Sequence, residues 1–159
     1  MDFVPFFWGE AVGEQKSSHL KTLYFNRADA AAIAIAVLNS SIFYWWFIAL
    51  SNCRDLGSRE INNFPIGLEK LTDTDKARLT HLSSALMVDL KSHAKRKNCV
   101  YKATGQVIYD EFYPKQSKPI IDEIDKILAQ HVGLDEQESD LIINYDIKFR
   151  LGSDEEADA

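Results

Sequence analysis

The feature that most constrains this fold is Ala30 to Leu50, a run of twenty-one residues without a charged side chain. About 20 apolar residues suffice to span a bilayer, and the same run can form the central helix of a protein core. Asn39, Ser40 and Ser41 stand at its middle, where each would need a hydrogen-bond partner in hydrocarbon. No Lys or Arg cluster flanks the run. We therefore expect one long, almost fully buried helix, with a membrane span as the alternative.

This helix is expected to begin at Asn26 to Asp29 and to end at Ser51 and Asn52. Its expected buried face packs under a sheet and holds Ile33, Val37, Tyr44, Trp45 and Ile48.

Short aromatic-rich stretches before the run predict two strands. They are Phe3 to Trp8 and Leu20 to Phe25. The polar residues from Gly13 to His19 between them predict an exposed loop. After the run, residues 53–66 predict an irregular segment that returns to the core.

The second half of the chain predicts mainly helices. Leucines on one stripe after the capping residue Thr72 predict an amphipathic helix from Thr72 to Arg96. Val107 to Tyr113 is rich in β-branched and aromatic residues and predicts an extended segment. Ser117 and Gly133 bound another predicted helix, and a capping-box pair predicts a last short one. That pair is Asp135 and Glu138.

The predicted fold class is therefore α+β, with a small, incomplete β-sheet packed on the long buried helix and a helical extension after it. Residues 1–66 are expected to form the first unit, residues 67–151 the helical extension, and residues 152–159 a disordered acidic tail.

Charge does not point to nucleic acid. The net charge is -6, and the chain shows no overall basic balance of the kind typical of nucleic-acid binders. Lys95 to Lys97 fall near the end of a predicted helix. The helix dipole stabilises cations at that end, and this explains the basic cluster without nucleic acid.

Catalytic and metal-binding patterns are not found. The sequence has no glycine-rich phosphate loop, no HExxH and no Gly-x-Ser-x-Gly. His81 and His93 lack metal-ligand spacing and are expected at the surface. Cys53 and Cys99 fit no CxxC pattern and are expected to be reduced thiols, which predicts a cytoplasmic protein.

Two stretches resemble a known family. Leu38 to Phe47, followed by Arg54-Asp55-Leu56 and Asn63 to Ile66, is similar to the target-recognition region of adenine-specific DNA methyltransferases of restriction-modification systems. Residues 117–125 and 134–150 are similar to the carboxy-terminal end of large, type IIG-like enzymes of that group. The resemblance implies that residues 1–66 are part of a target-recognition domain.

In that family S-adenosylmethionine binds a separate catalytic domain, and the flipped adenine is held by an Asn-Pro-Pro-Tyr type motif. No Asn in this chain precedes Pro. The resemblance therefore implies a carboxy-terminal portion, from an excised piece or a truncated reading frame, that recognises or positions double-stranded DNA. Such a portion would hold no cofactor and perform no catalysis by itself.

Polar residues in the irregular segments are the expected DNA contacts, because Arg and Asn read guanine and adenine through two hydrogen bonds. The candidates are Lys16, Ser17, Ser18, His19, Arg54, Arg59, Asn62 and Asn63. For the two arginines, pairing with Asp55 or Glu60 is an equal alternative. A solvated connection is the alternative for the first loop.

The alternative function is a protein-interaction module. The acidic balance and the aromatic amino-terminal half are typical of a surface that docks on a catalytic methyltransferase subunit or on a second copy, giving a homodimer.

Overall fold

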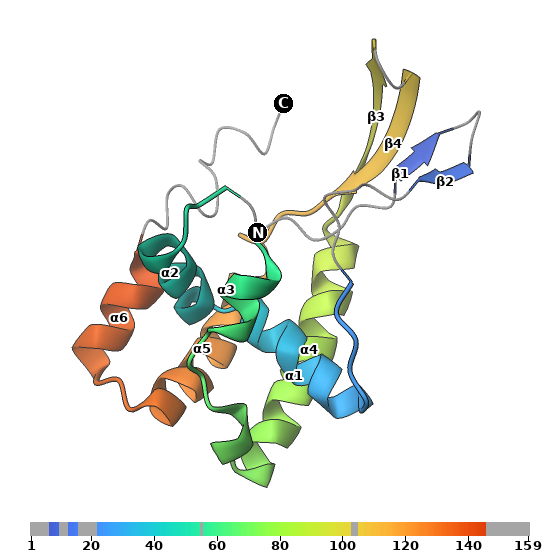
Figure 1. Cartoon of the computed structure of the whole chain (residues 1–159). Coiled ribbons are helices and arrows are strands. Elements are labelled where there is room, and N and C mark those ends of the chain that lie inside the picture. Colours follow the sequence, from blue (N-terminus) through green and yellow to red (C-terminus); the bar gives the residue numbers. More distant parts are fainter. Residues whose placement is uncertain (1–6, 10–12, 16–21, 55, 103–104, 146–159) are drawn as a thin grey trace.

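The computed structural model describes residues 7–9, 13–15, 22–54, 56–102 and 105–145, and its elements form an α+β fold (Figure 1). This confirms the predicted fold class. The helices are α1 (Ala28–Leu38), α2 (Ser41–Leu50), α3 (Ser58–Asn62), the 3-10 turn η1 (Leu68–Lys70), α4 (Asp73–Ser92), α5 (Lys118–Val132) and α6 (Glu136–Asn144). The strands are β1 (Phe7–Gly9), β2 (Gly13–Gln15), β3 (Lys95–Tyr101) and β4 (Gly105–Glu111).

The four strands form one antiparallel sheet in the order β2-β1-β4-β3. β3 and β4 pair along their full lengths, from Lys95 opposite Glu111 to Tyr101 opposite Gly105. Together they make a hairpin that extends away from the helices (Figure 1).

The charge-free run is broken in the middle, so the prediction of one long helix was wrong. α1 and α2 meet at an angle of 65°. Asn39 ends α1, where its amide Nδ2 donates to the Ile35 carbonyl at 2.7 Å. Ser40 caps α2 by accepting from the Phe43 N–H at 3.0 Å and donates to the Val37 carbonyl. Both side chains hydrogen-bond the backbone, and by doing so they end one helix and begin the next.

Burial of the run is also less complete than predicted. In α2 only Ser41, Ile42 and Phe43 are buried, whereas Trp45 is 36% exposed and Leu50 69%. No single helix in the described parts of the chain is long and apolar enough to cross a membrane. The bent pair α1 and α2 reaches that length and hydropathy only when the two are taken together.

The core lies among the helices rather than between a helix and the sheet. Ile33 and Val37 of α1 belong to one buried cluster with Leu79 of α4 and Ile124 of α5. None of the described side chains of the β3–β4 hairpin belongs to it. The expected packing of the long helix under a sheet was therefore wrong, because α1 packs on α2, α4 and α5 instead. This core draws on both sides of residue 66, and the division into two units stays a prediction.

The predicted irregular segment, residues 53–66, does return to the core, but Ser58–Asn62 within it form helix α3, so the prediction of irregular structure was wrong there. Ile66 is buried at 7% exposure, and the ring Nε2 of His131 lies 2.8 Å from its carbonyl oxygen. Since a carbonyl only accepts, Nε2 is the donor and ties this segment to the end of α5.

Local capping signals predicted ends of the later helices correctly. Thr72 caps α4 by accepting from the Asp75 N–H, and Gly133 takes the left-handed conformation after α5 with φ 79°. Asp135 and Glu138 form the predicted capping box of α6, at 2.8 and 3.0 Å. Val107 to Tyr113 is extended as predicted, since β4 covers most of it.

Three boundaries differ from the predictions. Thr22 to Phe25, the described part of one expected strand, form no strand, and their side chains are exposed with no strand recorded beside them. Gly13–Gln15, expected in a loop, pair with β1 instead. α4 ends at Ser92 rather than at Arg96, because the next residues pair with β4.

Candidate nucleic-acid interface

The segment from Arg54 to Asn63 brings four of the predicted contact residues together. Arg54 follows α2, Arg59 and Asn62 lie on α3, and Asn63 ends that helix. All four side chains are exposed. The other four predicted residues, Lys16, Ser17, Ser18 and His19, lie outside the described residues.

Local hydrogen bonds give this segment its shape. Glu60 folds back so that its Oε2 accepts from the Gly57 N–H at 3.0 Å, which closes the first turn of α3. Asn63 closes the last turn by donating from Nδ2 to the Arg59 carbonyl at 2.7 Å. The Arg54 N–H donates to Asn52 Oδ1 at 3.1 Å. These bonds use backbone groups and leave both guanidinium groups at the surface.

The predicted alternative for Arg59 was an ion pair with Glu60, and the Glu60 carboxylate is directed to Gly57 instead. Among the described residues, neither Arg54 nor Arg59 takes part in a recorded ion pair. Asp55, the alternative partner of Arg54, lies outside the described residues. Two guanidinium forks therefore face solvent within one short segment.

A second basic region was missed by the sequence analysis. Lys95 to Lys97 lie on strand β3 and not at the end of a helix, so the helix-dipole explanation of these cations was wrong. Residues 91–118 contain seven Lys and Arg against two Asp and Glu, whereas the whole chain contains 18 against 24. Its positive residues are Lys91, Lys95, Arg96, Lys97, Lys102, Lys115 and Lys118.

The two acidic residues of β4 face cations across the hairpin. Arg96 binds Asp110 through two hydrogen bonds, at 2.8 and 3.0 Å. The Arg96 guanidinium lowers the pKa of the Asp110 carboxyl, and the carboxylate raises the pKa of Arg96. Lys97 Nζ lies 3.4 Å from Glu111 Oε2.

Two tyrosines lie on the face of the sheet that carries Glu111. The Tyr113 hydroxyl donates to Glu111 at 2.5 Å, and this hydrogen bond is the main cause that lowers the pKa of Glu111. Lys95 Nζ lies 5.2 Å from the centre of the Tyr113 ring, within the range of a cation–π contact. On the same face, the Cys99 thiol lies 3.9 Å from the Tyr109 hydroxyl, and this contact raises the pKa of Tyr109 to about 12.

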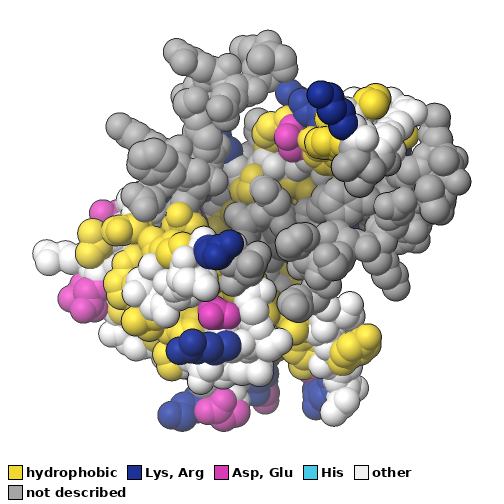
Figure 2. Space-filling view, turned by 45° about the horizontal axis from the view of Figure 1, so that its top comes forward, with side chains coloured by type: hydrophobic (Ala, Val, Ile, Leu, Met, Phe, Trp, Pro, Cys, Tyr) yellow, Lys and Arg dark blue, Asp and Glu magenta, His cyan; other side chains and the backbone are white. Residues whose placement is uncertain are grey.

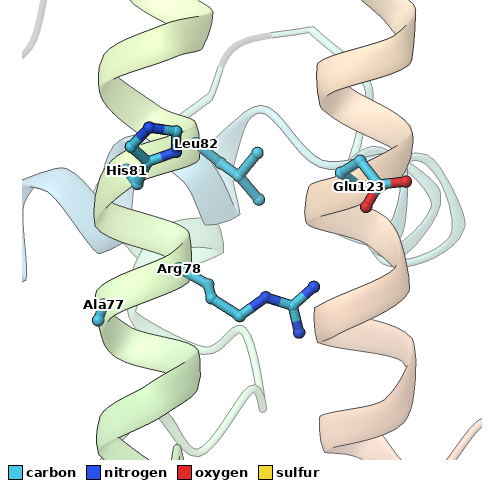
Figure 3. Close-up of a pocket in the computed structure, with 5 residues that line it drawn as sticks. All are labelled: Ala77, Arg78, His81, Leu82 and Glu123. Atoms are coloured by element: carbon cyan, nitrogen blue, oxygen red, sulfur yellow. The ribbon is translucent and has the colours of Figure 1, made fainter.

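A surface hollow between α4 and α5 has a volume of about 360 Å³ (Figure 3). Figure 3 shows Arg78 reaching from α4 toward α5, where Glu123 also lines the hollow. Lys126 is the main cause that lowers the pKa of Glu123, and Arg78 adds to it. A neighbouring hollow of about 620 Å³ between α1 and α4 is also lined by both signs of charge. Thr80, Ser84 and His81 line the second hollow, but both hydroxyls donate to backbone carbonyls, of Lys76 and Thr80 respectively, and not to the imidazole. We therefore assign no catalytic role to either hollow.

One Ser, Asp and His set occurs among the described residues, and its order is wrong for catalysis. Ser117 Oγ donates directly to Asp89 Oδ2 at 2.7 Å, and His93 Nδ1 lies 3.5 Å from the same oxygen. A nucleophilic Ser needs the His between itself and the carboxylate. Ser117 is also fully buried. The contact therefore joins α4 to the start of α5.

Metal binding has no candidate in the part of the chain that the structure describes, where no group of three His, Cys, Asp or Glu could hold an ion. His81 and His93 are exposed, as predicted. Cys53 and Cys99 are free cysteines.

No family model, curated protein or solved structure matches this chain.

Proposed function

We propose that this chain recognises or positions duplex DNA for site-specific adenine methylation and does not catalyse the transfer by itself. The observation that carries the proposal is the exposure of Arg54, Arg59 and Asn62, which present two guanidinium groups and a carboxamide within ten residues, beside exposed Asn63, whose amide also caps α3. These are the side chains that read guanine and adenine in the major groove. The resemblance of residues 38–66 and 117–150 to adenine-specific methyltransferases supplies the reaction that the binding would serve.

The partners follow from this proposal. The chain would act beside a catalytic methyltransferase domain or subunit, and S-adenosylmethionine would bind there. A cytoplasmic location would give access to the DNA.

Binding can be tested with duplexes selected from a random library and measured by fluorescence anisotropy. Arg54→Lys and Arg59→Lys keep the charge but lose the planar fork. Each change is expected to reduce discrimination of the selected sequence by about 1–3 kcal/mol while leaving non-specific binding nearly unchanged. The matched control is Arg78→Lys, an exposed arginine on α4.

Two results would contradict this proposal. Absence of any salt-sensitive duplex binding at about 50 mM salt would exclude DNA recognition. Methyl transfer from labelled S-adenosylmethionine by the chain alone would exclude the non-catalytic assignment.

A protein-interaction module is the second candidate, and exposed apolar side chains of two neighbouring helices favour it. Leu50 of α2 is 69% exposed and Leu141 of α6 63%. Figure 2 shows hydrophobic side chains gathered on the side of the molecule where these helices lie. The occupant would be a second copy of the chain or the catalytic subunit.

Sedimentation velocity over a concentration series tests self-association. Leu50→Ser with Leu141→Ser is expected to favour the monomer, because burial of apolar surface drives association. Val88→Ser is the control, since Val88 on α4 is equally exposed at 69%. Monomer at every concentration would exclude the homodimer.

A further inference from the structure

The β3–β4 hairpin lies outside the hydrophobic core of the helical body. Its strands are held by a continuous antiparallel register, yet none of its described side chains is buried. The first residue after it that packs on the core is Phe112. β3 forms an edge of the sheet. Most side chains of β3 are exposed, whereas most of those of β4, which also pairs with β1, are half-buried.

The sign of its charge indicates the partner. The hairpin and its two junctions carry most of the basic excess described above, in a chain whose net charge is -6. Figure 2 shows Lys and Arg side chains on the side of the molecule where the hairpin lies. A local concentration of cations is typical of surfaces that follow a phosphate backbone.

Protection of a sheet edge is the simpler explanation of lysines on β3, because edge lysines prevent strands from pairing with other chains. That explanation covers Lys95 and Lys97. It does not cover Lys91 at the end of α4 or Lys115 beyond β4, whereas Lys118 pairs with Asp122 on α5. The basic region therefore continues past the edge strand on both sides.

The strand register sorts the hairpin into two faces. Arg96 and Asn98 lie on one face, together with Gln106 of β4, whose Nε2 donates to Asn98 Oδ1 at 3.0 Å. Lys95 and Lys97 lie on the other. β4 also pairs with β1, so β3 is an edge of a four-stranded sheet, and its cations on both faces can contact the phosphates of a duplex that lies along this edge.

The ion pairs across the hairpin do not block such contacts. Arg96 is highly exposed, with a side-chain exposure of 73%, and Lys97 is 38% exposed. Exposed ion pairs contribute little to stability, so a phosphate can replace Asp110 or Glu111 at small cost.

We propose that the β3–β4 hairpin is a second DNA contact, whose cations bind the phosphate backbone of the duplex that the Arg54–Asn63 segment reads. The inference rests on the proposed DNA recognition. In Figure 1 the segment between α2 and α3 and the base of the hairpin lie toward the same end of the helical body. The Arg54–Asn63 segment would supply sequence discrimination, and the hairpin would supply affinity that does not depend on sequence.

The test is the salt dependence of duplex binding by a triple variant, Lys95→Ala, Lys97→Ala and Lys102→Ala. The slope of log K against log salt is expected to become shallower by about 2–3, with a similar loss of affinity for every sequence. The charge-matched control is Lys70→Ala, Arg78→Ala and Lys126→Ala on the helical body, for which the slope should stay unchanged. Circular dichroism checks that each variant folds.

Asp110→Asn tests the same inference in the opposite direction. It removes a negative charge and frees Arg96, so binding should become several-fold tighter and the slope steeper by about 1.

The outcomes separate the two proposals. Wild-type binding with an unchanged slope in the hairpin triple variant would overturn the hairpin contact and leave DNA recognition by Arg54 to Asn63 standing. An equal change in the control variant would also overturn it, because a general charge effect would then explain the data. No duplex binding by the wild-type chain would overturn both proposals.

Discussion

The helical body and the β3–β4 hairpin of this chain differ in both burial and charge. The buried side chains of the described residues lie in helices, in segments that join helices, or at Ser117 just before α5, and the hairpin has none. The hairpin region is basic, whereas the chain as a whole is acidic. Stability and surface charge are thus supplied by separate segments, and substitutions should affect one property without the other.

Phe43→Ala should have the largest effect on stability. Phe43 is fully buried at the start of α2, with its ring 5.0 Å from that of Phe64 and 6.0 Å from that of Trp46. We expect a loss of about 3–5 kcal/mol in the free energy of unfolding, measured in urea. A loss below about 1 kcal/mol would show that the body does not depend on this contact, since surface changes have effects of that size.

Asp125→Ala should have the next largest effect on the free energy of unfolding. This fully buried carboxylate on α5 accepts from the Ser41 N–H at 2.7 Å and so stabilises the start of α2. Removing it should lower the free energy of unfolding by about 1–3 kcal/mol, because a buried donor loses its acceptor. Asp122→Ala on the same helix, whose partner is Lys118 in a half-exposed ion pair, should lower it by less than about 1 kcal/mol. Equal effects of the two substitutions would contradict the prediction.

Sequence patterns predicted the body better than the hairpin, and the reason is the range of the interactions. The boundaries of α5 and α6 follow from Ser117, Gly133 and the Asp135 capping box, signals that act within one turn. β3 has no alternation of apolar and polar residues in Lys95 to Lys97, and its strand conformation comes from pairing with β4. Such pairing is set by the partner strand and the turn between them.

The sequence contains a local signal for the break at Asn39 and Ser40, but the prediction of one long helix gave more weight to the surrounding apolar residues. Both residues favour helix ends, yet their position inside a charge-free run favoured one continuous helix. At the candidate site, composition identified Arg54, Arg59 and the two asparagines, because polar residues in an irregular segment are usually exposed. The hairpin cations were missed because a helix end explained them equally well.

On the hairpin, Arg96→Ala should show most clearly that a substitution can weaken duplex binding without a large loss of stability. Its ion pair with Asp110 is exposed, so the free energy of unfolding should fall by less than about 1 kcal/mol. Duplex binding should weaken despite this small change in stability, as measured by urea denaturation and anisotropy on one sample. A loss of stability comparable to that of Phe43→Ala would show that the hairpin is part of the folding core.

The smallest of the predicted effects is a weakening of the strand pairing in the hairpin at acid pH. The pKa values of Asp110 and Glu111 are lowered in the folded chain, by Arg96 and Tyr113 respectively. A carboxylate with a lowered pKa adds stability above its unfolded pKa, and this stability is lost as the pH falls through the folded value. Amide chemical shifts of β3 and β4 should therefore move as the pH is lowered below about 4. In Asp110→Asn the part due to Asp110 should be absent, and an unaltered titration in that variant would exclude this ion pair as its source.

The most direct test of the whole account is the salt dependence of duplex DNA binding by the wild-type chain, compared with the hairpin triple variant and its charge-matched control. The account predicts binding that weakens steeply with salt, a slope shallower by about 2–3 in the hairpin variant, and no change in the control. Duplex binding that does not depend on salt, or no binding at about 50 mM salt, would contradict it.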